Sequence, residues 1–394
     1  MRADVAGADR RQQVREAARG WRGAGAIDQA VCTAIETAYP DDRARLGPVF
    51  RILVFGFTIV IVNALFGLFT LGVSAAGKQA AQVLLAFFGL ALVAATEVQV
   101  GPLRRTQGGT EAATAWLGVC YLLGALVWLM ADSAKLGGDA WVDPALVLVV
   151  ILFGAAAYRW GYALFAVIAA SGLFLLLARG PLGRALWLVV PVVVAPLLLR
   201  AGDWARLPPA HRRCCQAVAV VSLGFLYLAV HLGSWDQGFV ERVGAHWNGH
   251  PPWAAQSLRP FFAVATALVP VLTLAWGRGT RRRLLINAGL IGLLASMVTL
   301  RFYVHVAPLW VVLLLGGGVA IGLALALRQH LDSGPGRQRH GFTAEPLFAD
   351  PEGRSALELA ASVASLSPAA RPVETSSFEG GGGRFGGGGA SGTY

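Results

Sequence analysis

Charged side chains are scarce in this chain. Only 14% of its 394 residues are Asp, Glu, Lys or Arg, compared with about 25% in soluble globular domains. The mean hydropathy is correspondingly high, at +0.58. So few charges cannot cover a water-soluble surface, which excludes an ordinary soluble domain and makes a lipid bilayer the expected solvent.

Cysteines are also scarce, and sequence signatures of common enzyme classes are missing. The four cysteines are Cys32, Cys120, Cys214 and Cys215, and none of them forms the C-x-x-C spacing of a zinc or redox site. There is no H-E-x-x-H motif, no G-x-S-x-G elbow and no C-x-x-C-H haem attachment. The sequence therefore predicts no metal, no cofactor and no catalytic residue.

Apolar runs long enough to cross a bilayer dominate the middle of the chain. A helix of about 20 apolar residues spans the hydrocarbon core. We expect such helices at residues 50–73, 79–98, 112–131, 144–158, 160–178, 185–200, 215–234, 259–276, 284–300 and 303–327. Arg159 separates the short fourth run from the fifth, so residues 144–178 form either a tight hairpin or one kinked element. The predicted fold is an all-α polytopic bundle of about ten transmembrane helices.

Polar segments flank this bundle and define three regions, residues 1–48, 49–328 and 329–394. The last region is rich in Pro, Ser, Gly and Ala, and it ends in two glycine repeats. Such a composition cannot form a packed core, so we expect a disordered tail in which only residues 356–366 have a helical pattern.

The N-terminal region is expected to be a small helical hairpin. Its first helix sets Val14, Ala18 and Trp21 opposite Arg11, Arg15, Arg19 and Arg22. Its second helix starts at the N-cap Asp28, carries an apolar stripe of Ile27, Val31, Ile35 and Tyr39, and ends before Pro40. The two helices either pack on each other, which we favour, or lay the arginines on anionic lipid headgroups.

The excess of basic over acidic residues, 33 against 22, indicates membrane orientation. Nucleic acid is not an expected partner, because the basic residues lie between apolar runs instead of on a folded polar face. Nearly all of them are arginine, since Lys78 and Lys135 are the only lysines. This usage is typical of a GC-rich genome and favours a bacterial source.

Alternate loops differ in their basic charge, and cytoplasmic loops carry the excess. One side holds Arg104, Arg105, Arg159, Arg206, Arg212, Arg213, Arg278, Arg281, Arg282 and Arg283. The other holds Lys78, Lys135, Arg179, Arg184, Arg242, Arg259 and Arg301. The first side also matches the basic flanks of the bundle, so both termini are expected in the cytoplasm, with the chain in the inner membrane.

Polar side chains within or beside the apolar runs are the first candidate site residues. An ionisable group near the bilayer centre costs about 2.5–3.5 kcal/mol on insertion scales, so such groups often have a function. The candidates are Asn63, Glu97, His231, Asn287, Arg301 and His305. Asn63 and Asn287 are the most central, and bonds to neighbouring helices are the alternative role for them.

The loop after the seventh run is the second candidate site. It contains Asp236, Glu241, His246 and His250 and is flanked by His231, while Arg301 and His305 reach the same side of the membrane. Converging histidines and carboxylates suit a metal, a proton or an anionic substrate. The loop also holds Trp235, Trp247 and Trp253, which are typical of a membrane interface, and we favour that structural interpretation.

Two glycine patterns each have a functional and a structural interpretation. Residues 72–79 nearly spell a phosphate-binding loop, but Gln79 replaces the Ser or Thr that holds magnesium, so we expect a turn. Gly318 and Gly322 form a G-x-x-x-G pattern within the last apolar run. Small residues at this spacing allow close helix packing, and we expect contacts within the chain.

The segment Gly25-Ala-Ile27-Asp28-Gln29, followed by Tyr39-Pro40 ahead of the first apolar run, resembles a family of predicted bacterial multi-pass membrane proteins of unknown function. The Arg301-Phe302-Tyr303 step is similar to an Arg-aromatic-aromatic-Asp step of that family, with Val304 in place of the acid. The glycine-rich end around Arg384-Phe385 resembles the tails of membrane proteins that carry a TPM domain. These resemblances imply a cytoplasmic helical unit followed by many short-looped membrane helices, and they supply no catalytic residue.

Three functions are compatible with these features. The first is a non-enzymatic inner-membrane protein whose hairpin and tail bind protein partners. The second is a secondary transporter or channel, which requires a polar cavity at the midplane. The third is an intramembrane enzyme that uses the outer histidines and acids.

Overall fold

The computed structural model describes residues 3–23, 25–40, 43, 47–73, 77–105, 108–133, 140–180, 183–204, 207–231, 252–304, 309–333, 338–339 and 342–343. Residues up to Ala344 form one compact unit. Residues 345–394 are a second unit that lies outside the described part, as does most of the predicted disordered tail.

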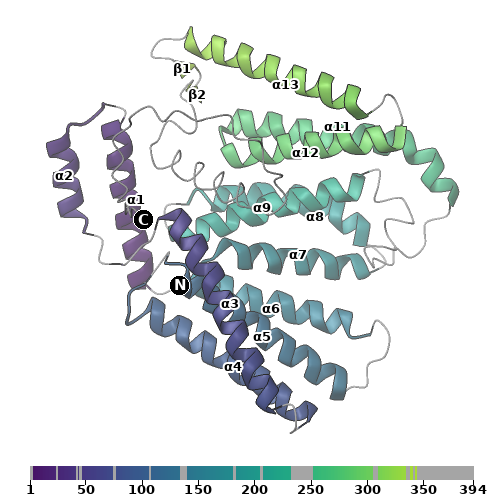
Figure 1. Ribbon diagram of the computed structural model, residues 1–394. Helices are drawn as coiled ribbons and strands as arrows, with labels where there is room; N and C mark the ends of the chain where they lie inside the picture. Colours follow the sequence, from purple (N-terminus) through teal and green to yellow (C-terminus); the bar gives the residue numbers. More distant parts are fainter. Residues whose placement is uncertain are drawn as a thin grey trace, which may run out of the picture. The chain divides into compact units, whose positions relative to one another are not determined.

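Helices make up nearly all of the described chain (Figure 1). They are α1 (Ala3–Gly23), α2 (Gln29–Ala38), α3 (Pro48–Val73), α4 (Lys78–Val100), α5 (Thr110–Ser133), α6 (Val142–Trp160), α7 (Ala163–Arg179), α8 (Gly183–Ala201), α9 (Pro209–Val230), α11 (Pro252–Thr280), α12 (Arg283–Val304) and α13 (Leu309–Asp332). The antiparallel pair β1 (Gln338–Arg339) and β2 (Phe342–Thr343) follows α13. The predicted all-helical class is confirmed apart from this short pair.

Each predicted apolar run overlaps one of the helices from α3 to α13. Among the described residues, seven helices are long and apolar enough to cross a membrane. Helix α7 and the Ala185–Ala201 part of α8 are apolar but shorter. Seven candidate spans fit a membrane protein, whereas the count of ten crossings stays a prediction.

Residues 144–178 form two helices and not one kinked element. Helix α6 ends where Gly161 adopts a left-handed conformation with φ 76°, a geometry that glycine accepts without a steric penalty. Helix α7 then returns along α6, and an ion pair between Arg179 and Asp143 joins the far ends of the two helices. The tight-hairpin alternative is therefore the observed one.

Consecutive helices pack as hairpins, and glycines bring their backbones together. The most extensive pairings are α4 with α5, α6 with α7, α8 with α9 and α11 with α12. A Cβ atom at Gly89 of α4 would lie 2.9 Å from the backbone nitrogen of Leu122 in α5. One at Gly289 of α12 would lie 2.8 Å from the backbone nitrogen of Leu274 in α11. These contacts leave no room for a side chain at either glycine.

The expected packing role of Gly318 and Gly322 is not observed in the described residues. A Cβ atom at either position would meet nothing within 4 Å. Both glycines are exposed on α13, so the G-x-x-x-G pattern does not mark a contact within the described chain. Close contacts are instead made by glycines such as Gly89 and Gly289, which the sequence pattern did not single out.

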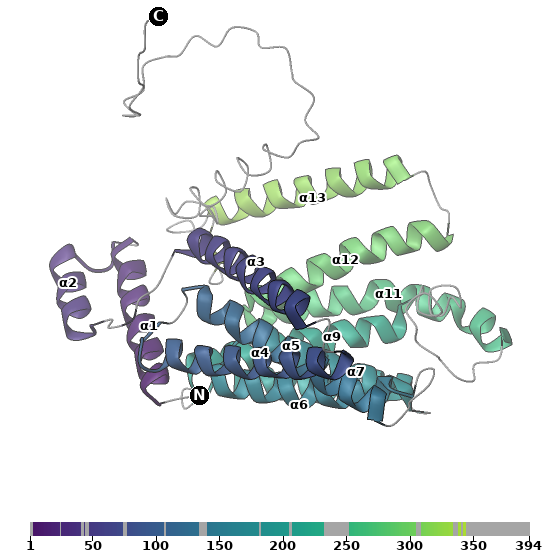
Figure 2. The same ribbon diagram turned by 60° about the horizontal axis from the view of Figure 1, so that its bottom comes forward.

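Helix α3 carries most of its apolar side chains on the surface. Its central apolar window contains no buried residue, and Phe57, Val60 and Leu68 are each about two-thirds exposed. In Figures 1 and 2, α3 lies along α5, which is its main helical neighbour. An apolar face of this size is unfavourable in water and matches contact with lipid.

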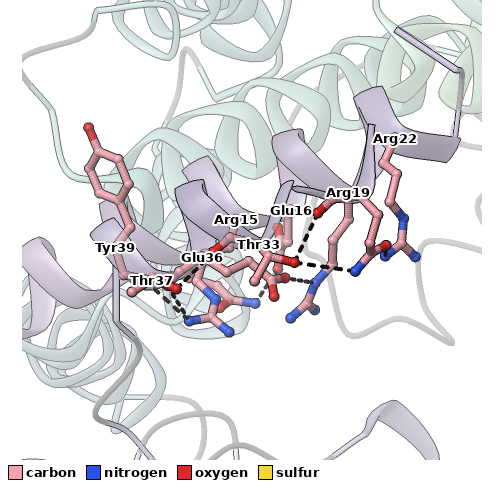
Figure 3. A network of polar contacts seen from close by, with 10 residues as sticks. Arg15, Glu16, Arg19, Arg22, Thr33, Glu36, Thr37 and Tyr39 are labelled. Carbon is pink, nitrogen blue, oxygen red and sulfur yellow. Dashed lines mark hydrogen bonds and ion pairs between the residues drawn. The ribbon is translucent and has the colours of Figure 1, made fainter. Parts of the chain in front are cut away.

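The hairpin of α1 and α2 is held together by arginines of α1, among them Arg15 and Arg19 (Figure 3). Arg19 forms an ion pair with Glu36 at 2.7 Å, and Arg15 donates to the carbonyl oxygens of Glu36 and Tyr39. These carbonyls lie at the C-terminus of α2, where the helix dipole favours a positive charge. Asp28 caps the other end by accepting a 2.7 Å hydrogen bond from the backbone N–H of Val31. Helices α1 and α2 thus contact each other through the arginines of α1, while Trp21, Val31 and Tyr39 stay exposed.

Replacing Gly89 by alanine is expected to lower stability, because the new methyl group would overlap Leu122. Overpacking of this kind costs about 1–3 kcal/mol. The measurement is the apparent melting temperature of the purified protein in detergent, followed by tryptophan fluorescence. Gly56→Ala is the matched control, since nothing lies within 4 Å of a Cβ atom there. Equal losses in the two variants would contradict the close-packing role.

The Arg19–Glu36 ion pair makes hairpin stability depend on pH. The hydrogen bond from Arg19 lowers the pKa of Glu36 below 4.5 in the folded hairpin. The contribution is therefore fully present above pH 4.5 and is lost as the pH falls through the lowered value. At neutral pH, Glu36→Gln should speed hydrogen exchange in α2 roughly two- to fivefold after correction for intrinsic rates.

Well below pH 4.5 the Glu36→Gln variant and the parent should exchange alike, because Glu36 is then protonated. Glu16→Gln removes the same charge from α1, where Glu16 accepts a local hydrogen bond from Gln12. This control should leave the rate of hydrogen exchange in α2 unchanged. A neutral-pH effect as large as that of Glu36→Gln would argue against the ion pair as the cause.

Candidate functional site

A cavity of about 330 Å³ lies where the helix ends on the arginine-rich side meet. Its walls come from α1, the start of α3, the end of α4, the start of α5, the α6–α7 turn and the start of α9. The lining side chains that carry charge are Asp9, Arg51, Glu111 and Arg213. Pockets of this size, mostly apolar with a few polar groups, are typical of small-ligand sites.

Glycines position two of the cavity walls. Gly109 has φ 97°, and a Cβ atom there would lie 2.4 Å from the carbonyl oxygen of Arg51, so the start of α5 rests directly on the backbone of α3. Gly161 ends α6 and reverses the chain, which places Trp160 and Tyr162 on the same wall. The glycines at these helix ends thus bring the cavity residues together.

Glu111 is the most deeply buried charged group of the cavity. Its side chain is 0% exposed, and its Oε1 atom accepts a 2.7 Å hydrogen bond from the backbone N–H of Gly108. It lies in the first turn of α5, where the helix dipole stabilises a negative charge. A buried carboxylate beside a cavity is a ready partner for a cationic group.

Tyr162 lies among three charged groups of the same cavity. Burial raises the pKa of its phenol, Glu111 and Asp9 raise it further, and Arg51 opposes them. The hydroxyl therefore stays protonated at neutral pH and is available as a hydrogen-bond donor. Trp116, Trp160 and Phe165 complete an aromatic wall, and the rings of Trp116 and Phe165 stack at 6.1 Å.

Helix α1 forms the remaining wall with Val5 and Asp9. Val5 and Ala8 are buried, and Gln13 accepts a 2.9 Å hydrogen bond from Arg212 of α9. The first half of α1 is thus anchored to α9, whereas its second half bears the arginines that hold α2.

Glu97, a predicted site residue, lies beside the cavity in an ion pair. Arg159 donates to both of its carboxylate oxygens, at 2.8 and 2.6 Å, and Trp160 Nε1 donates at 2.9 Å. The same Trp160 lines the cavity. Glu97 therefore joins α4 to α6 and orients a wall residue, and it does not line the cavity itself.

The two predicted asparagines are not brought together. Asn63 of α3 donates to its own helix at Ile59 and accepts a 3.0 Å hydrogen bond from the hydroxyl of Tyr121 in α5. This matches the expected alternative of a bond between neighbouring helices. Asn287 is exposed on α12. Neither residue lines the cavity.

His231, at the end of α9, belongs to a separate polar cluster between α9, α11 and α12. Its Nε2 atom lies 2.8 Å from Thr299 Oγ1. One turn earlier, the Tyr227 hydroxyl meets Ser296 Oγ at 3.0 Å, and Ser296 donates to the carbonyl of Thr266. These bonds connect three helices through buried and half-buried polar groups, as is common in membrane bundles.

The other candidates of the outer site lie outside the described residues. They are Asp236, Glu241, His246, His250 and His305, together with the side chain of Arg301. Their convergence with His231 is therefore still a prediction.

Neither metal chemistry nor similarity assigns a function to this site. Within the described part of the chain, no three His, Cys, Asp or Glu side chains are grouped in a way that could hold a metal ion. No family model, no curated protein and no solved structure matches the chain. Its chemistry has to be derived from its own cavity, charges and hydrogen bonds.

The cavity residues were missed at the sequence level because their spacing is not a motif. Asp9, Arg51, Glu111 and Arg213 are far apart in the chain, and arginines beside apolar runs are equally explained by membrane orientation. One available signal was Glu111, an acid in the first turn after Gly108 and Gly109. Another was the Arg159–Gly161 break, at which two apolar runs had to reverse.

The Glu97–Arg159 pair is expected to behave as one unit in mutation. Glu97→Gln leaves the Arg159 charge without its ionic partner, and Arg159→Gln does the same for the Glu97 carboxylate. Each variant should therefore have a lower apparent melting temperature. The double variant should lose less than the sum of the two singles, because the partners share one interaction. A fully additive loss would contradict this coupling. Asp203→Asn breaks the separate Arg282–Asp203 pair. Its loss of melting temperature should add to that of either single variant.

Proposed function

We propose that this chain is a non-enzymatic multi-pass protein of the bacterial inner membrane, with ten crossings and both termini in the cytoplasm. The seven long apolar helices and the lipid-compatible surface of α3 support a membrane location. Helix α7, with 17 residues, is about 25 Å long and lies at the short end of the range for a crossing. The arginine excess at alternate loops supports the orientation.

The proposed activity is ligand binding at the cytoplasmic face, and the cavity of about 330 Å³ is the observation that carries it. Its charged lining residues belong to helix ends that all fall on the arginine-rich side. Binding at such a place fits a receptor or partner protein better than a passage through the membrane.

A transporter is less well supported by the described residues. That function requires a polar cavity at the midplane, and the candidate polar residues Asn63, Glu97 and Asn287 do not line the cavity at the helix ends. Asn63 and Glu97 bond to different helices through different partners. Enzymatic use of the outer histidines has no described geometry to support it.

The hairpin and the tail remain the proposed sites for protein partners. Val31 of α2 and its C-cap residue Tyr39 are exposed, and the hairpin is stabilised by its own ion pair. The proposed kinship with predicted bacterial membrane proteins of unknown function rests on the same hairpin, followed by short-looped helices.

Reporter fusions test the proposed topology. Fusions after residues 108, 210 and 394 should give a cytoplasmic signal, because these positions belong to the arginine-rich side or to the C-terminus. Fusions after residues 76 and 136 should report the opposite side and act as matched controls. An external signal from any of the first three would overturn the ten-crossing arrangement.

A further inference from the structure

The charges of the cavity are arranged in two zones. The carboxylates are buried, since Glu111 is 0% and Asp9 is 9% exposed. The guanidinium side chains of Arg51 and Arg213 are exposed while lining the same cavity. The negative groups are therefore more buried than the positive groups.

The deep zone has the chemistry of an ammonium site. Glu111 offers a buried carboxylate, and Trp116, Trp160 and Tyr162 line the cavity beside it. Aromatic faces attract a cation, and the attraction strengthens when water is excluded. A primary ammonium also donates hydrogen bonds, which a buried carboxylate accepts strongly.

The outer zone has the chemistry of a phosphate site. Guanidinium groups bind phosphate oxygens through paired N–H donors. Arg51 and Arg213 come from different helices, α3 and α9, so one anion between them would be held from two sides. The two zones share one cavity, and a ligand that satisfies both must carry both charges.

We propose that this cavity binds a zwitterion made of a primary ammonium and a phosphate, such as an ethanolamine–phosphate unit. The ammonium lies against Glu111 and the aromatic wall, and the phosphate lies between Arg51 and Arg213. This assignment deepens the proposed function and rests on its binding cavity. The same unit occurs in a free phosphorylated amino alcohol and in the headgroup of phosphatidylethanolamine.

The direct test is a titration of the full-length protein in nanodiscs of phosphatidylglycerol, which contain no amine. Phosphoethanolamine and ethyl phosphate are compared by calorimetry, since they differ in the ammonium group. Phosphoethanolamine should bind at least about tenfold more tightly, which is the effect of one hydrogen bond to a charged group. Measurable binding of both compounds with equal affinity would overturn the ammonium site.

Variants then assign each charge to its zone. Glu111→Gln should weaken phosphoethanolamine about ten- to a hundredfold and leave ethyl phosphate unchanged. Arg51→Gln should weaken both ligands. The matched controls, Glu16→Gln and Arg200→Gln, remove the same charges outside the cavity and should change neither. A Glu111→Gln effect equal to that of Glu16→Gln would overturn the proposal.

A cavity-filling variant keeps the test valid if Glu111→Gln does not fold. Ala163→Trp inserts a large ring into the cavity wall and should abolish phosphoethanolamine binding. Ala94→Trp makes the same change at an exposed position of α4 and should not affect it. Unchanged binding in Ala163→Trp would place the ligand elsewhere and overturn the proposal.

Short-chain phosphatidylethanolamine and short-chain phosphatidylglycerol, titrated in detergent, separate the two sources. Preferential binding of the ethanolamine lipid alone identifies a lipid headgroup as the ligand, and binding of both ethanolamine compounds identifies the shared unit. If neither phosphoethanolamine nor the ethanolamine lipid binds, the ligand assignment is overturned. The topology of the proposed function is tested independently by the reporter fusions, so the two failures are distinguishable.

Discussion

Hydrogen bonding of the backbone inside each helix is the constraint on which the other features depend. In hydrocarbon an unsatisfied peptide group costs several kcal/mol, so an apolar chain crosses as helices. Hydroxyl side chains follow the same rule: Thr58, Thr70 and Thr273 each donate to a carbonyl four residues earlier in their own helix. In the apolar helices charged groups then lie near the helix ends, and the cavity forms where several of these ends meet helix α1.

Arginine serves two purposes in this chain. Between apolar helices its distribution is the basis of the predicted orientation, and at several positions it also makes a specific contact. Arg159 binds Glu97, Arg282 binds Asp203, and Arg15 bonds to the carbonyls that end α2. Arginine suits these contacts because its planar group forms several hydrogen bonds at once. Within the described residues, several of these arginines therefore have a structural role in addition to their charge.

The helices could be predicted from the sequence, whereas most of the site could not. The apolar runs predicted helices α3 to α13, and Asp28 predicted the start of α2. Both predictions were possible because length, polarity and capping are local properties. The partner of Glu97 and the cavity around Glu111 depend on which helices become neighbours. The glycines at the α4–α5 contact were missed for the same reason, since Gly89 faces Leu122 only after the helices pair.

Helix α1 takes part in two contacts at once. Val5 and Asp9 close the cavity, while Arg15 and Arg19 hold α2. A ligand that touches Val5 and Asp9 binds more tightly when α1 is docked, so by thermodynamic linkage it also favours the docked helix. Occupancy of a site at the membrane surface would thereby fix the position from which the hairpin meets a partner. In that respect α1 is a coupling element, and its sequence is constrained on two faces.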